Sequence, residues 1–234
     1  VEAAERTRLL ARLREFRGFL ERELFAAPLE QIAALQTEAQ LMAWHAQDPW
    51  RGDFRFFLSV AHDTGLATLG RGTGRYLSYG ASPQPGGGAV FAPGVWHGGA
   101  GELRALDAAT IFEDATHAWL ADAGGPRHPS MGITQPEPDK ADAYTWNKAP
   151  RLGGEVVETG AIARQLVAGH ALVREVVARH GGTVYTRVLA RLLELAQVVP
   201  MMEQWLRQLV PQEAYCNPAL LPADGVGVGL SEAA

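Results

Sequence analysis

The chain has 234 residues, of which 47% are hydrophobic and 20% charged, and its formal net charge is −5. This composition is ordinary for a folded globular protein and excludes an intrinsically disordered chain, which needs low hydrophobicity and high net charge. Interspersed charges of both signs disfavour a nucleic-acid-binding surface, which needs a basic stripe. The single cysteine, Cys216, excludes an internal disulfide framework, and no run of 18 apolar residues predicts a transmembrane helix.

The first part of the chain is predicted to form three helices. Apolar residues recur every three or four positions through residues 4–24, which places one apolar stripe on a helix. Proline suits a first helical turn, so a second helix is expected over Pro28–His45, and Pro49 follows its end. A third helix is predicted for Asp53–Leu69, with a carboxylate near its start, where the helix dipole favours negative charge.

The segment Gly70–Gly101 is rich in glycine, proline, serine and aromatic residues. This composition predicts short strands, such as Arg75–Tyr79 and Ala89–Phe91, between turns. The alternating glycines at 70, 72 and 74 do not spell the dinucleotide fingerprint Gly-x-Gly-x-x-Gly, and no Gly-Lys-Ser/Thr follows them. The segment therefore carries no nucleotide-binding motif.

The next part of the chain combines a short helix, a long loop and two further helices. A helical stretch is expected to begin at Asp107 and to run into Ile111–Leu120. The loop Asp122–Glu155 contains five prolines, and a loop of this length is usually functional or packed by its own side chains. Helices are then predicted for Glu158–Ala168 and Leu172–Arg179.

The strongest helical pattern covers Thr183–Leu209. Thr183 is a good N-cap, and apolar residues cover most of the circumference of the helix that follows. A helix of this kind is buried, so we expect it to form the core and to pack against Leu9–Leu24 and Gln31–Met42. Pro200 removes one backbone donor and is expected to kink the helix.

No motif in the chain predicts a catalytic, cofactor-binding or metal site of its own. The seven histidines are scattered, no His-Glu-x-x-His is present, and no Cys/His pair has the spacing of zinc ligands. The hydrolase motif Gly-x-Ser-x-Gly is absent as well. Cys216 lies in a turn-like Ala-Tyr-Cys-Asn-Pro context without an obvious base, which is more typical of a packed thiol than of a nucleophile.

The pair Glu113 and His117 is the most suggestive set of titratable groups. On the predicted helix the two residues are four apart and share a face. A carboxylate and an imidazole in this arrangement can relay protons or bind a metal. The alternative is a polar pair that docks the end of the helix against the long loop.

A second set of candidates surrounds the Gly153-Gly154 pair and combines opposite charges with aromatic rings. Its members are Tyr144, Trp146, Lys148, Arg151, Glu158 and Arg164. Such charges can form a buried ion network or an interface, because arginine suits bidentate pairing with carboxylates and accompanies aromatic residues in interface cores. A solvated surface is the alternative.

Five motifs in a fixed order resemble the central region of the large subunit of nickel–iron hydrogenases. They are Gly74-Arg-Tyr-Leu-Ser-Tyr-Gly80, the Glu-Asp-x-x-His-Ala-Trp stretch within Ile111–Trp119, His128-Pro129, Tyr144-Thr-Trp-Asn-Lys-Ala-Pro-Arg151 and Glu158-Thr-Gly-Ala-Ile-Ala-Arg164. The closing Ser231–Ala234 resembles the start of that family's Glu-Ala-Pro-Arg-Gly motif. Three residues depart from the family pattern: Ala118 stands where serine is usual, and Ser130 and Leu152 replace aromatic residues.

The resemblance implies a mainly α fold with a minor irregular β part around Arg75–Leu106. It also implies that residues 1–234 are a single domain and an internal piece of a longer large subunit. That family splits hydrogen reversibly into protons and electrons at a nickel–iron centre, or senses hydrogen, and pairs with an iron–sulfur small subunit. The protein is then expected in the cytoplasm or peripheral to the membrane.

The family holds its metals with two Cys-x-x-Cys pairs, one near each end of the subunit, and neither pair is present here. We therefore expect no catalytic, cofactor-binding or metal-binding residue in this chain, and no activity from it alone. The candidate residues are instead expected to contribute to a partner interface or a proton relay. They are Glu113, His117, Tyr144, Trp146, Lys148, Arg151, Glu158 and Arg164. Aromatic residues exposed on a proline-rich loop are costly in a free monomer, so the loop is expected to pack near the iron–sulfur subunit.

A non-catalytic accessory or assembly protein is the alternative to an enzyme or a sensor. Accessory or assembly proteins can resemble the large subunit and lack its metal-ligating cysteines, and the departures at Ala118 and Ser130 are compatible with such a degenerate relative. Cysteine pairs in the coding sequence on either side of Val1 and Ala234 distinguish an enzyme or a sensor from such a protein.

Overall fold

The computed structural model describes residues 1–84, 88–99, 101–122, 124–214 and the positions 216, 224, 225, 227 and 232. The α-helices are α1 (Ala3–Phe19), α2 (Leu29–Ala33), α3 (Glu38–Ala46), α4 (Asp53–Asp63), α5 (Ala161–Ala168), α6 (Ala171–His180) and α7 (Val184–Gln208). A π-helical turn (Leu20–Leu24) extends α1, and 3-10 turns cover Leu66–Thr68, Ala108–Thr110 and Pro129–Met131. The strands are β1 (Arg75–Pro83), β2 (Ala89–His97), β3 (Glu102–Arg104), β4 (Ile111–Asp114) and β5 (Ala149–Leu152).

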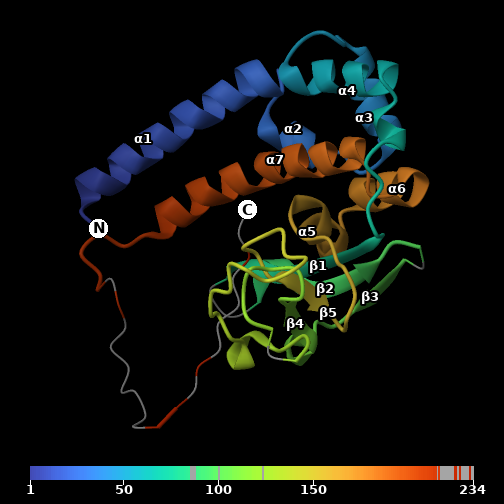
Figure 1. The fold of residues 1–234 in the computed structure, drawn as a ribbon. Helices are drawn as coiled ribbons and strands as arrows, with labels where there is room; N and C mark the ends of the chain where they lie inside the picture. Colours follow the sequence, from blue (N-terminus) through green and yellow to red (C-terminus); the bar gives the residue numbers. More distant parts are fainter. Residues whose placement is uncertain are drawn as a thin grey trace.

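The molecule has a helical layer above a β-containing part (Figure 1). The long helices α1 and α7 lie alongside each other, and α2 packs against α7. Below them, α5 contacts α7 on one side and strands β1 and β2 on the other, so it connects the two parts. Strands β1, β2 and β3 form one antiparallel sheet in that order, and β4 and β5 form a second. The prediction of a mainly α fold with a minor β part is confirmed.

Helix α7 is the core of the helical layer. Thr183 and Thr186 form a capping box in which each side chain bonds the backbone N–H of the other, so the helix begins where predicted. Leu189 and Leu193 are fully buried, as expected for a helix with so wide an apolar face. The helix continues through Pro200. Its predicted contact with the first helix is confirmed.

The other predicted contacts and stripes are only partly correct. The second predicted helix is interrupted after Ala33, because the side chain of Thr37 accepts a hydrogen bond from the N–H of Gln40 and starts α3 anew. Its first half, α2, packs on α7, whereas α3 packs against α6. On α1, Leu9 is 39% exposed, so only part of the predicted stripe is buried.

The close approach of α5 to the sheet depends on a glycine. A Cβ built on Gly94 of β2 would lie 3.1 Å from Val167 of α5 and 3.1 Å from Leu103 of β3. Distances this short require both neighbours to move, so a side chain at this position would push the helix away from the sheet.

The helix predicted across Ile111–Leu120 is wrong. Ile111–Asp114 is strand β4 and pairs with β5, which lies inside the segment predicted to be loop. The side chain of Asp114 accepts hydrogen bonds from the N–H and the hydroxyl of Thr116. This local turn competes with a helix for the backbone and ends the strand. Glu113 and His117 therefore do not share a helix face.

The third predicted helix is also shorter than expected, because α4 ends at Asp63 and Gly65 adopts a left-handed conformation with φ of 69°. Among the described residues, no helix is both long enough and apolar enough to span a bilayer. Apart from Glu232, the Ser231–Ala234 motif lies outside the described residues.

Candidate functional site

The side chains of Glu113 and Lys148 form an ion pair between the two strands of the small sheet. Glu113 lies on β4 opposite Pro150 of β5, and Lys148 directly precedes β5. The Nζ atom of Lys148 donates to Oε2 of Glu113 at 2.9 Å. A Cβ at Gly132 would lie 3.0 Å from the same carboxylate oxygen, so a neighbouring loop covers the pair closely. The structure thus joins two of the predicted site residues that are far apart in the sequence.

His117 and Tyr144 form the second contact of this region. Their rings are stacked with centroids 5.8 Å apart and an interplanar angle of 27°. The backbone fixes this arrangement, because the N–H of Tyr144 donates to the carbonyl of His117 at 3.1 Å. Nδ1 of His117 lies 3.3 Å from the carbonyl oxygen of Asp142. The tyrosine side is open to solvent, with Tyr144 being 74% exposed.

Trp146 lies against Trp119, with ring centroids 5.3 Å apart, and is itself 52% exposed. The loop around these rings is ordered by Lys140, whose Nζ donates to the carbonyls of Ala115 at 2.7 Å and Leu120 at 2.9 Å. This lysine is not identifiable from the sequence, because a lysine that binds carbonyls leaves no pattern of charges there. The exposed large apolar side chains between residues 129 and 156 are Met131, Ile133, Tyr144, Trp146 and Val156, and we refer to this set as the aromatic face.

Arg151 lies on β5 beside this face. Its Nη1 donates to the carbonyl of Pro150 at 2.8 Å. The carboxylate of Asp114 is close enough to feel the charge of Arg151, although the pKa of Asp114 is lowered mainly by the hydrogen bonds from Thr116. In the part of the chain that the structure describes, Arg151 forms no ion pair with a carboxylate.

Glu158 belongs to a separate cluster. It forms an ion pair with Arg187 of α7, which also donates to the carbonyl of Gly70 at 2.6 Å. The hydrogen bonds from Arg187 to Glu158 are the main reason why the pKa of the guanidinium is raised. This cluster ties the glycine-rich segment before β1 to α7.

Arg164 belongs to a third cluster, which is buried. From α5 it donates to both carboxylate oxygens of Glu194 on α7, at 2.8 and 2.6 Å, and to Glu232 at 2.6 Å. Glu232 also accepts the backbone N–H of Tyr79 at 2.9 Å. The side chains of Arg164 and Glu232 are only 4% and 3% exposed. Bonding to Glu194, the largest cause, raises the pKa of Arg164 despite its burial.

Of the alternatives left open for the charges around Gly153-Gly154, a single shared ion network is not formed among the described residues. Lys148, Glu158 and Arg164 each bind a different partner: Lys148 pairs with Glu113 of β4, whereas Glu158 and Arg164 pair with Arg187 and Glu194, two separate positions on α7. The reason is that the partners are contributed by β4, α7 and Glu232. The two partners on α7, Arg187 and Glu194, were visible in the sequence as polar positions on an otherwise apolar helix.

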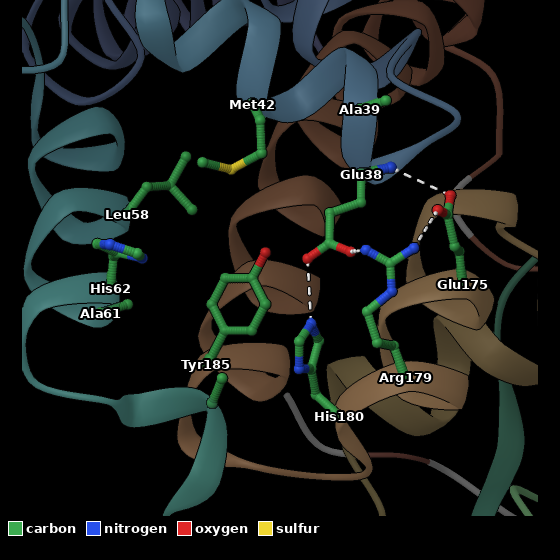
Figure 2. Close-up of a pocket in the computed structure, with 11 residues that line it drawn as sticks. Glu38, Ala39, Met42, Leu58, Ala61, His62, Glu175, Arg179, His180 and Tyr185 are labelled. Atoms are coloured by element: carbon green, nitrogen blue, oxygen red, sulfur yellow. Dashed lines mark hydrogen bonds and ion pairs between the residues drawn. The ribbon is translucent and has the colours of Figure 1, made fainter.

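The helical part contains an apolar cavity of about 350 Å³ (Figure 2). Its apolar wall is formed by Met42, Leu58, Ala61 and Ala67. On the polar side, Glu38 bonds Nε2 of His180 at 3.1 Å through one oxygen and pairs with Arg179 through the other. Burial, and to a smaller extent the charge of Glu38, raises the pKa of Tyr185. Both oxygens of Glu38 are occupied, so the carboxylate is held in place as part of the wall.

A model of the nickel-dependent hydrogenase family matches residues 25–233 of the chain. The chain belongs to this family. The periplasmic NiFeSe hydrogenase large subunit of Desulfomicrobium baculatum is 28% identical over an alignment of 190 residues, which covers 73% of this chain and 37% of that subunit. The resemblance deduced from the five motifs is confirmed.

Solved structures show the same fold. The Ni-Fe-Se hydrogenase of Desulfovibrio vulgaris Hildenborough in its as-isolated oxidised state superposes with a TM-score of 0.72 at 22% identity, covering 95% of this chain and 44% of that one. The reduced, active Ni-Fe-Se hydrogenase of Desulfomicrobium baculatum gives a TM-score of 0.68 at 22% identity, covering 94% of this chain and 43% of that one. The hydrogenase-family chain thus spans less than half of the length of these relatives.

The residues of this hydrogenase-family chain do not fit a nickel–iron centre. Soft thiolates are the ligands that suit such metals, and the chain has one cysteine. Cys216 is exposed, so the prediction of a packed thiol is wrong. Among the described residues, no three histidine, cysteine, aspartate or glutamate side chains gather into a possible metal site.

Proposed function

We propose that this chain is part of the large subunit of a nickel–iron hydrogenase, which oxidises hydrogen reversibly to protons and electrons or senses it. The observation that carries the proposal is the family match over residues 25–233 together with the common fold. In this proposal residues 1–234 form one domain of a longer subunit, and the metal ligands lie outside them. We propose that the protein is located in the cytoplasm or at the periphery of a membrane.

The role of these residues in the proposed enzyme is to build the helical scaffold and the surface that meets a partner. Helix α5 joins the helical layer to the sheets, and the Arg164–Glu194–Glu232 cluster holds residue 232 against it. The metal centre would supply the hydrogen chemistry. Glu113, His117 and Lys148 are proposed to serve the partner interface or the movement of protons near it.

We further propose that the aromatic face packs against the iron–sulfur small subunit. Its support is the exposure of Tyr144 and Trp146, which is unfavourable in a free monomer, and the neighbouring Arg151 that lacks a carboxylate partner among the described residues. Aromatic side chains and arginine dominate the binding energy of interfaces. Burial by a partner would remove the cost of the exposed rings.

The metal content of the full-length protein tests the proposed enzyme class. We expect nickel at one equivalent in the full chain, and loss of nickel on dialysis of residues 1–234 alone, because the ligands are absent. A non-catalytic accessory protein is the second candidate, supported by the single cysteine and by Ala118 and Ser130. Full-length protein without nickel and without hydrogen uptake would favour that candidate.

Arg151→Ala in the full complex tests the interface. We expect association with the small subunit to weaken by about tenfold, the loss typical of an important interface residue, with the melting temperature almost unchanged. Arg104→Ala is the matched control, since Arg104 is an exposed arginine on β3 that pairs with Glu102. If Arg151→Ala assembles normally but unfolds several degrees earlier, Arg151 belongs to an internal network and the interface proposal is wrong.

A further inference from the structure

A second hollow, distinct from the cavity of Figure 2, lies where three segments meet. The segments are residues 71–76, residues 97–99 at the end of β2, and residues 177–182 at the end of α6. Its volume is about 530 Å³, within the range of small-molecule sites. We call it the glycine cleft, because Gly72, Gly74, Gly98, Gly99, Gly181 and Gly182 line it.

The charged side chains that line the glycine cleft are all basic. Arg71, Arg75 and Arg179 lie in its wall together with His97, and no acidic residue is among the described residues that line it. This is unusual in a chain with a net charge of −5. Two of these arginines are paired with carboxylates that are not among the lining residues, Arg75 with Glu155 and Arg179 with Glu38 and Glu175. The carboxylate of Glu158, which pairs with Arg187, lies behind Gly72, 2.6 Å from a Cβ built there.

Arg71 has the largest unused bonding capacity of the three arginines. Its Nη2 donates to the carbonyl of His180 at 3.3 Å, a long hydrogen bond at the end of α6. Within the described part of the chain it has no carboxylate partner. A guanidinium carries five N–H donors, so most donors of Arg71 remain for a ligand.

Tyr76 supplies an independent observation. It is fully buried, and its hydroxyl has no hydrogen-bond partner among the described residues. Burial is the main cause that raises its pKa to about 12, so at neutral pH the hydroxyl remains a donor. The hydroxyl lies at the wall of the cleft, where a Cβ on Gly182 would be 2.3 Å from it. A buried donor without an acceptor is costly, and an oxyanion in the cleft would satisfy it.

The lining leaves room for such a ligand to approach the backbone. A Cβ built on Gly74 or Gly99 meets no heavy atom within 4 Å, so open space lies over both residues. Backbone N–H groups, guanidinium groups and a phenol are donors that together suit phosphate or carboxylate oxygens.

We propose that the glycine cleft binds a small free polyanion, carrying phosphate or carboxylate oxygens, with Arg71 and the hydroxyl of Tyr76 as its main donors. The site shares no lining residue with the aromatic face. It requires no nucleotide motif, because the recognition is of the anionic groups alone.

Calorimetric titration of the full-length protein with pyrophosphate, and separately with citrate, at constant ionic strength tests the proposal. We expect saturable binding of at least one anion, weakened about tenfold by Arg71→Gln through loss of charged hydrogen bonds and several-fold by Tyr76→Phe, which keeps the ring. Gly99→Leu should block the cleft without changing any charge. Arg12→Gln, on the exposed face of α1, is the control and should bind as the wild type does.

Arg71 also caps α6, so the melting temperature of each variant accompanies the titration. Weakened binding in Gly99→Leu with an unchanged melting temperature supports the proposal even if Arg71→Gln folds poorly. Absence of saturable binding to either anion overturns it. Equal weakening in Arg12→Gln also overturns it, because the effect would then reflect the overall charge of the protein.

Discussion

The helical layer contains buried ion pairs between its helices, whereas the segment from β4 to β5 has aromatic rings exposed on loops. In the helical layer, Glu203 of α7 is 4% exposed and pairs with Arg17 of α1 and Arg207 of α7. In the segment from β4 to β5, Tyr144 is 74% exposed and Trp146 is 52% exposed. The helices also expose rings, at Phe19, Trp50 and Phe56, so the difference between the two regions lies in the buried ion pairs, which tie the helices to one another.

The two regions should respond differently to substitution. A buried charge of an ion pair in the helical layer is stabilised by its partner, so removal of one member leaves the other buried and unpaired. An exposed ring contributes little to the stability of the free chain, and its removal affects mainly what the surface binds. Variants can thus separate residues that hold the fold from residues that recognise a partner.

The largest effect is expected for Arg164→Leu. This change leaves Glu194 and Glu232 buried without their cation and should destabilise the protein by about 3–5 kcal/mol. Urea unfolding measures the loss, with Arg12→Leu as the control, because Arg12 pairs with Glu15 on an exposed face and should change stability by under about 0.5 kcal/mol. Adding Glu194→Leu to Arg164→Leu should recover part of the loss. Equal stability of Arg164→Leu and the control would show that the cluster is not structural.

The next largest effect is expected for Leu193→Ala. Leu193 is fully buried in α7, and truncation of such a side chain costs about 2–5 kcal/mol through lost burial and the cavity left behind. Trp146→Ala removes a larger side chain but should cost less, because half of that ring is already in water. Melting temperatures of the two variants measure the difference. If Trp146→Ala destabilises the free chain as much as Leu193→Ala, the aromatic face belongs to the core.

The fold was predictable where the signal is local. Helix α7 follows from a threonine cap and a repeated apolar spacing, both of which lie within the helix itself. The strand β4 was missed because four residues cannot distinguish a strand from a helix without their partner, and β5 begins 35 residues after β4 ends. The turn formed by Asp114 and Thr116 is a local signal against a helix at this position.

The residues of the candidate site could be predicted from the sequence, but the contacts between them could not. Glu113 and Lys148 were both identified, and the structure joins them across the small sheet. The partner of Arg164 lies 30 residues away on α7, and a second partner lies 68 residues away at Glu232. The spacing of charges in the sequence contains no information about such distant contacts, so it could not show that these charges form three separate clusters.

The smallest expected effect is a loss of stability in acid, which should begin at different pH values in the two regions. Both ring nitrogens of His170, which precedes α6, are buried without a hydrogen-bond partner, and burial lowers the pKa of this group below its ordinary value of 6.5. In the segment from β4 to β5, the pKa of Asp114 is lowered from 3.8 by the bonds from Thr116. The helical layer should therefore lose stability at a higher pH than the other region.

The free energy of unfolding should fall as the pH falls, because unfolding allows His170 to take up a proton. Below pH 6.5 the unfolded chain protonates this imidazole while the folded chain does not, so stability is complete above 6.5 and falls as the pH approaches the lowered pKa. The slope is at most about 1.4 kcal/mol per pH unit, the limit for one proton. Hydrogen exchange of α5 and α6 between about pH 7 and pH 5 should report this loss. His170→Leu should flatten the dependence, and His62→Gln, at an exposed position, should leave it unchanged. An unchanged slope in His170→Leu would assign the acid sensitivity to other groups, such as His45, whose pKa burial also lowers.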